Sequence, residues 1–113
     1  MNTVKLEVCS REETNRRFLH AFEGEVQEPV ISFESASLLF KVLTQKRWDL
    51  LVAMQGAGPI SLREAARRAQ RDVKAVHGDV HALLKAGVID KTDDGKIVFP
   101  YDAIHVDFML KAA

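Results

Sequence analysis

The spacing of apolar residues changes along the chain, and each spacing predicts a different kind of element. Apolar side chains occupy every second position over residues 3–9, which predicts a strand with one apolar face. A short apolar run at residues 29–33 predicts a second strand, and alternation over residues 104–110 predicts a final one. Between these strands the apolar spacing is mostly three to four residues, which is typical of helices. The chain is therefore predicted to be an α+β protein.

Short polar residues mark where the predicted helices begin. Five of them precede runs of helical spacing and are typical N-caps, namely Ser10, Ser35, Thr44, Ser61 and Asp72. Ser61 is followed three residues later by Glu64, the spacing of a capping box. Gly87 follows the last helical run and predicts its end. The helices are expected at about residues 11–24, 36–43, 45–54, 62–70 and 73–86.

Each central helix is predicted to bury one apolar stripe. The first stripe comprises Leu38, Leu39, Val42 and Leu43. The second comprises Trp48, Leu51 and Val52, widened by Leu50 and Met54. The third comprises Val73, Val76, Val80, Leu83 and Leu84. Because Trp48 lies on such a stripe, it is predicted to be a core residue rather than a base-stacking surface.

Residues 61–87 have the pattern of a helix-turn-helix. Two short helices are separated by only a few residues, and the outward face of the second carries small and basic side chains. Residues 88–99 then return to a two-residue period around Asp94-Gly95, a strong hairpin turn. Three helices followed by a hairpin predict a winged helix-turn-helix domain over residues 35–101.

The segments outside that domain are predicted to serve in association. Residues 1–34 are interpreted as a strand-helix-strand extension for dimerisation or partner binding, and residues 102–113 as a C-terminal strand for dimerisation. An unpaired apolar strand is an aggregation hazard. The two end strands are therefore expected to pair with each other or with a second copy of the chain, and the protein is predicted to be a homodimer.

Nine residues are predicted to contact DNA if the second helix enters a major groove. Arg63, Arg67 and Arg71, on or just after the first helix, are expected to contact phosphates. The second helix would present base-edge contacts near its N-terminal end. Those contacts are assigned to Lys74, Ala75, His77, Gly78 and His81, and Lys96 of the hairpin is expected to reach the backbone.

The charge distribution is compatible with DNA binding although the net charge is zero. The chain has 16 basic and 16 acidic residues. From Lys46 to Lys96 there are ten Lys or Arg and seven Asp or Glu, so the centre carries +3 and the flanks carry −3. A basic centre favours a nucleic-acid partner. The acidic hairpin tip, Asp93 and Asp94, favours the second helix over the wing as the element that reads sequence.

No pattern of catalytic or cofactor chemistry is evident in the sequence. It shows neither a Gly-rich phosphate loop nor a nucleophile with an adjacent base, so we predict no enzymatic activity and no cofactor. His77 and His81 have a spacing that can chelate a metal, but the sequence offers no third ligand, and they are interpreted as solvent-facing or phosphate-contacting. No apolar run approaches the roughly 20 residues of a membrane span. The single Cys9 and the absence of a leader pattern predict a cytoplasmic protein.

The residues from Leu43 to Phe108 resemble a prokaryotic family of winged-helix, MarR-like DNA-binding proteins. The likeness lies in four motifs that occur here in the family's order, which are KRW, GPxSxRExAR, RDVKxVHxDVxxLxxxG and PYDxIxxxF. The resemblance implies a DNA-binding regulator. Such proteins are often encoded beside a small toxin, as in TumE/TumA-type toxin–antitoxin pairs, where the DNA-binding member is the antitoxin.

The sequence thus predicts a homodimeric repressor that binds a palindromic operator in double-stranded DNA, with a cognate toxin as a further possible partner. The competing hypothesis is a winged-helix module for protein interaction. In that case the domain neutralises or scaffolds a partner, and DNA binding is not essential.

Overall fold

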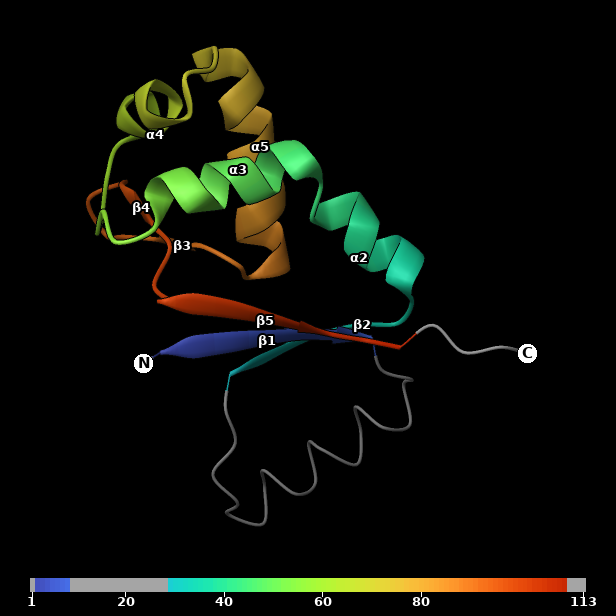
Figure 1. The fold of residues 1–113 in the computed structure, drawn as a ribbon. Helices are drawn as coiled ribbons and strands as arrows, with labels where there is room; N and C mark the ends of the chain where they lie inside the picture. Colours follow the sequence, from blue (N-terminus) through green and yellow to red (C-terminus); the bar gives the residue numbers. More distant parts are fainter. Residues whose placement is uncertain (1, 9–28, 110–113) are drawn as a thin grey trace.

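The computed structural model describes residues 2–8 and 29–109 (Figure 1). In chain order its elements are β1 (Thr3–Val8), β2 (Val30–Phe33), α2 (Ala36–Val42), α3 (Gln45–Met54), α4 (Leu62–Ala69), α5 (Val73–Ala86), β3 (Asp90–Lys91), β4 (Ile97–Val98) and β5 (Ala103–Asp107). The α+β prediction is confirmed for these residues. The predicted helix at residues 11–24, the single Cys9 and the end of the last predicted strand lie outside them.

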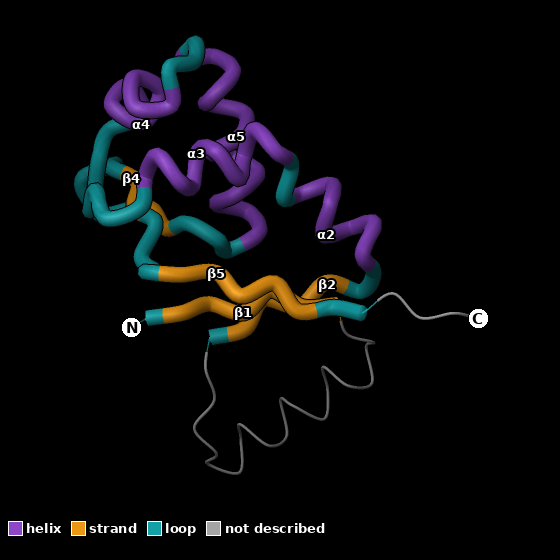
Figure 2. Tube along the Cα trace, in the orientation of Figure 1, coloured by secondary structure: helices purple, strands orange, loops and turns teal. Residues whose placement is uncertain are grey.

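The helices gather on one face of a small sheet (Figure 2). α2, α3 and α5 lie over the strands, and α4 stands beyond α3 at the end farthest from the sheet. The short β3–β4 hairpin lies beside α3 and follows α5 in the chain. The N-terminal end of α5 therefore points away from the sheet, and its C-terminal end points toward it (Figure 1).

The strand at the start of the chain forms the centre of a parallel sheet with order β2-β1-β5. Val4 is opposite Ile104, and Leu6 is opposite Val106 on one side and Ile31 on the other. The prediction that the two end strands pair with each other is confirmed within a single chain. Parallel strands need long connections, and here the whole helical region separates β2 from β5.

The two faces of β1 differ in the chemistry of their side chains, although Glu7 on the polar face is also buried. Val4 and Leu6 are fully buried and pack with Leu39 of α2. On the other face, Lys5 Nζ lies 3.2 Å from the Asp107 carboxylate. Pairing in this register therefore buries the apolar side chains under the helices and places opposite charges side by side on neighbouring strands.

Backbone and side-chain hydrogen bonds also fasten the beginning of β1 to the segment before β5. The Asn2 N–H donates to the Asp102 carboxylate at 2.8 Å, and the Asp102 N–H donates to the Asn2 carbonyl at 2.7 Å. The Asn2 side chain donates to the Pro100 carbonyl at 2.9 Å. Gln55, just after α3, donates to the Asp102 carbonyl at 2.6 Å. The Pro100–Asp102 segment thus joins the sheet to the helical layer.

The predicted helix caps are confirmed wherever the structure describes them. Four side chains accept a hydrogen bond from a backbone N–H in the first turn of the helix that they precede. They are Ser35 for α2, Thr44 for α3, Ser61 for α4 and Asp72 for α5. Ser61 accepts from the Glu64 N–H at 3.1 Å, as in the first half of a capping box. Gly87 ends α5 in the left-handed conformation at φ 82°.

The core differs from the predicted stripes at four side chains, since Leu38, Trp48, Val52 and Val73 are all exposed. In α3 the buried residues are Leu50, Leu51 and Met54, whereas Trp48 is 38% exposed. The prediction that Trp48 is a core residue is therefore wrong, because the α3 face that packs on α4 and α5 is rotated from the one centred on Trp48. Val73, at the first turn of α5, is also exposed, whereas Val76, Val80 and Leu83 are buried.

An acidic side chain on α5 holds the helices together from within. The Asp79 carboxylate is only 15% exposed and accepts from Arg47 Nε of α3 at 3.0 Å. Arg71 Nη2, from the segment between α4 and α5, lies 2.7 Å from its other oxygen. Arg47 also donates to the Lys41 and Val42 carbonyls at the end of α2, both at 3.0 Å. One carboxylate and two arginines thereby fix α5 against α3, the α4–α5 joint and α2.

The two arginines set the protonation of this carboxyl group. Burial by itself raises the pKa of Asp79, but the hydrogen bonds and charges of Arg47 and Arg71 outweigh it and hold that pKa below its ordinary 3.8. A carboxyl group with a lowered pKa stabilises the folded state above its unfolded pKa. This stabilisation is lost as the pH falls below about 4 toward the folded pKa.

Asp79→Asn is expected to lower the free energy of unfolding at pH 7 by about 3 kcal/mol, because it leaves two half-buried arginines without their counter-charge. Urea denaturation at pH 7 and at pH 3 measures the effect. The difference between Asp79→Asn and the unmodified protein should shrink at the lower pH, where the native carboxyl group is itself being protonated. Asp90→Asn, at an exposed position, is the control and should change the free energy by no more than about 0.5 kcal/mol. Equal stability of Asp79→Asn and the unmodified protein at pH 7 would contradict the assignment.

Candidate nucleic-acid interface

The joint between α4 and α5 is made by a tight helix end and an immediate new cap. Gln70 adopts the left-handed conformation at φ 55°, and its N–H donates to the Arg67 carbonyl at 3.1 Å. The Arg71 N–H donates back to the Ala66 carbonyl at 3.0 Å, which completes a Schellman ending. Asp72 then caps α5. The chain consequently turns within three residues, which fixes the relative orientation of the two helices.

The exposed face of α5 carries the five residues predicted to contact base edges. Lys74, Ala75, His77, Gly78 and His81 are all exposed, and they lie on the side opposite the buried valines and Leu83. A Cβ atom added at Gly78 would meet no atom within 4 Å. Packing within the protein therefore does not require glycine at this position.

Among the predicted phosphate contacts on α4, Arg63 and Arg67 are both exposed. Arg67 pairs with Glu64 one turn earlier through both its Nε and Nη2 atoms, and Arg68 Nε lies 3.0 Å from the same carboxylate. The hydrogen bond from Arg67 has the largest influence on Glu64, and together with the hydrogen bond from Arg68 and the charges of both arginines it lowers the Glu64 pKa to about 2. Arg63 therefore presents its charge to solvent, whereas Arg67 shares its charge with a carboxylate.

Arg71 has a different position from the one its sequence neighbourhood indicates. Its side chain is half-buried against Asp79 and is absent from the exposed face shared by Lys74 and His77. Lys96, the predicted contact of the hairpin, is exposed, but its Nζ lies 3.9 Å from the Asp94 carboxylate. Asp94 also accepts from Thr92, which lowers the Asp94 pKa and favours a negative charge at the hairpin tip.

The hairpin is shorter than predicted and gains a third partner from the chain ahead of α4. Strand pairing is limited to Asp90 with Val98 and Lys91 with Ile97. Ile60, which precedes α4, pairs antiparallel with Ile97 through two backbone hydrogen bonds of 2.8 Å. The hairpin is therefore anchored to both ends of the α4–α5 unit.

Comparison with known proteins assigns a family. Residues 42–106, more than half of the chain, match the HVO_A0114 family, and this span runs from the end of α2 into β5. The chain belongs to the HVO_A0114 family. No curated protein and no solved structure matches it.

The span matched to the HVO_A0114 family contains the interactions that sequence reasoning missed. Arg47 of the KRW motif, together with Arg71 and Asp79 of the RDVKxVHxDV motif, forms the interior ion cluster. Asp102 of the PYD motif binds the start of β1. At Asp79 the sequence signal was an acidic residue next to the apolar stripe of α5. Its two partners, Arg47 and Arg71, lie 32 and eight residues away in the sequence, and only the fold identifies them.

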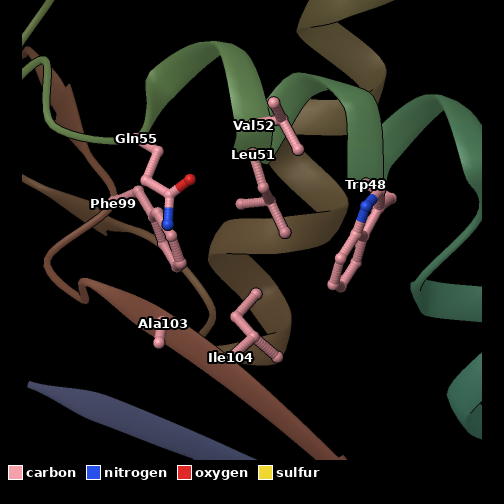
Figure 3. Close-up of a pocket in the computed structure, with 7 residues that line it drawn as sticks. All are labelled: Trp48, Leu51, Val52, Gln55, Phe99, Ala103 and Ile104. Atoms are coloured by element: carbon pink, nitrogen blue, oxygen red, sulfur yellow. The ribbon is translucent and has the colours of Figure 1, made fainter.

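A groove of about 250 Å³ lies between α3 and β5 (Figure 3). Trp48 and Val52 of α3 form one wall, and Phe99 and Ile104 approach from the hairpin and β5. Among the described residues, those that line it are apolar apart from the amide of Gln55, and none of them has an ionisable side chain.

The described residues contain neither a metal-ligand cluster nor a membrane-spanning helix. Within residues 2–8 and 29–109, no three His, Cys, Asp or Glu side chains gather closely enough to share a metal ion. No helix in the same part of the chain has the length and apolar character needed to cross a bilayer.

Gly78→Ala is expected to raise the free energy of unfolding by up to about 1 kcal/mol, because alanine favours the helix and its methyl group meets no neighbour. Thermal denaturation followed by circular dichroism measures the change. Gly87→Ala is the matched control and should be destabilising, since residue 87 has a positive φ. A loss of stability in Gly78→Ala would show that glycine is needed there for the free protein.

Proposed function

We propose that this protein is a DNA-binding transcriptional regulator whose α5 enters the major groove. The main support is the exposed α5 face, where Lys74 stands among the small residues Ala75 and Gly78 at the end of the molecule remote from the sheet. Small side chains permit close approach to base edges, and a lysine near the helix N-terminus can donate to guanine or to phosphate.

The order of the elements supports a winged helix-turn-helix interpretation. α3, α4 and α5 pack around one core, α4 and α5 meet at a three-residue joint, and the β3–β4 hairpin follows α5 directly. The Ile60–Ile97 pairing adds the short third strand between the first two helices of such a unit. In this arrangement the second helix of the pair is the reading element and the hairpin is the wing.

The charged residues of α4 and α5 suggest different roles for the two helices in binding DNA. Arg63 on α4 is exposed and suited to a phosphate, and Lys74 with His77 and His81 faces outward from α5. Arg71 would act by orienting α5 through Asp79 rather than by touching DNA. The acidic hairpin tip would stay clear of the backbone, because Asp94 is held in its charged form.

Lys74→Ala and Arg63→Ala are each expected to weaken binding to DNA from upstream of the protein's own gene by about tenfold or more, as one good contact is worth about 1–3 kcal/mol. Fluorescence anisotropy at several salt concentrations measures the affinity. Loss of a phosphate contact should also reduce the slope of the logarithm of the affinity against the logarithm of the salt concentration by about one. Gly78→Ala should weaken the same binding while leaving the protein at least as stable.

Lys41→Ala is the matched control, because Lys41 is exposed on α2, at the other end of the helical layer from α4 (Figure 1). It removes the same charge and should leave the affinity unchanged. Equal affinity of Lys74→Ala, Arg63→Ala and the unmodified protein for the DNA would refute α5 as the reading helix.

The proposed regulator acts as a homodimer, and an apolar band along β5 supports this part of the proposal. β5 is an edge of the described sheet. Beside it, Phe40 of α2 is 57% exposed and stacks edge-to-face on Phe108, with ring centroids 5.6 Å apart. Trp48 and Val52 continue this exposed apolar surface at the groove. A twofold dimer would place two α5 helices on half-sites about 34–36 Å apart or a multiple of that distance.

Phe40→Asp is expected to convert the dimer to a monomer, because it places a charge within this apolar band. Light scattering coupled to size-exclusion chromatography measures the mass. Val30→Asp, on the opposite edge strand β2, is the control and should remain dimeric. If Phe40→Asp remains a dimer, the β5 side is not the dimer surface.

The same exposed apolar band favours a second candidate, a protein-interaction module. On this alternative the surface formed by Phe40, Trp48, Val52 and Phe108 binds another protein, such as the toxin that the MarR-like resemblance implies. A monomeric protein with no affinity for the upstream DNA would select this candidate. In either role, including that of an autoregulating antitoxin, the proposal places the protein in the cytoplasm.

A further inference from the structure

The two histidines on the exposed face of α5 meet through corresponding ring atoms. Nε2 of His77 lies 3.1 Å from Nε2 of His81. The ring centroids are 4.3 Å apart, and the ring planes are inclined by 63°. The nitrogens are thus closer to each other than the rings are, so both imidazoles lean together at their Nε2 edges. Both side chains are exposed.

This separation is that of an N–H···N hydrogen bond, and it also falls within the range that one metal ion imposes on two neighbouring ligands. A metal–imidazole bond of about 2.1 Å places two nitrogens about 3.0 Å apart at a right angle and about 3.4 Å apart at the tetrahedral angle. The observed 3.1 Å lies between these limits and nearer the right angle. Little movement of either side chain is therefore needed for both rings to bind one ion.

We propose that His77 and His81 form a two-histidine chelate for a divalent transition-metal ion of the nickel, copper or zinc class. Imidazole nitrogen is a preferred ligand of these ions. Without the ion, one ring donates its Nε2–H to the other ring; with it, that proton moves to Nδ1 and both Nε2 lone pairs bind the metal. No net proton transfer to solvent is required between two neutral rings.

The surroundings of the pair define the kind of site. Lys74 and Lys85 are exposed on the same helix, three residues before His77 and four residues after His81 respectively. No group of three ligating side chains occurs among the described residues. The chelate therefore supplies two positions, and water or an incoming donor completes the coordination. Such a site binds an exchangeable ion rather than a buried structural one.

The test is titration of the untagged full-length protein with Ni²⁺ alone, followed by calorimetry and by paramagnetic broadening of histidine ring resonances. One ion per chain is expected, with broadening centred on His77 and His81. His77→Gln and His81→Gln should each lower the affinity for Ni²⁺ by about tenfold or more. Loss of a residue that only hydrogen-bonds a metal ligand already lowers metal affinity by about tenfold. Circular dichroism verifies that both variants are folded.

His105→Gln is the matched control, because His105 is an exposed histidine on β5. It should leave the affinity unchanged, as should Cys9→Ser. Unchanged affinity in His81→Gln, loss of binding in either control, or one ion shared by two chains would overturn the proposal. The measurement uses no DNA, so its failure leaves the proposed function standing, and failure of DNA binding leaves the chelate standing.

Discussion

The arrangement of the helices depends on a single carboxylate in the half-buried space between them. Asp79 receives Arg47 from α3 and Arg71 from the α4–α5 joint, and Arg47 continues to the last carbonyls of α2. Removal of one partner from such a cluster leaves an uncompensated charge in a poorly solvated place. The cluster therefore specifies one packing of α5 among those that the apolar core around it allows.

That constraint also determines which face of α5 remains outside. With Asp79 directed inward beside Val76 and Val80, Lys74, Ala75, His77, Gly78 and His81 are left on the exposed side. The proposed reading face and the histidine pair are thus consequences of the same rotation of the helix. Arg71 supports this face through its ion pair with Asp79.

The sheet depends on a second constraint, which joins the two ends of the described chain. β1 lies between β2 and β5, and the hydrogen bonds between Asn2 and Asp102 set its register with β5. Because Gln55 also binds Asp102, the sheet and α3 are held at the same point. The groove beside Trp48 and the exposed edge of β5 arise where these two layers meet.

The sequence by itself determined the described helices and the positions of their caps, because a cap acts over only a few residues. Ser35, Thr44, Ser61, Asp72 and Gly87 each have their predicted role. The tertiary structure alone decided the two partners of Asp79, the exposure of Trp48 and the half-buried position of Arg71. Each depends on how the helices rotate against one another. An apolar stripe about 100° wide does not fix that rotation. The contact of His77 with His81 was allowed by their spacing, but only the side-chain rotamers bring the two nitrogens to 3.1 Å.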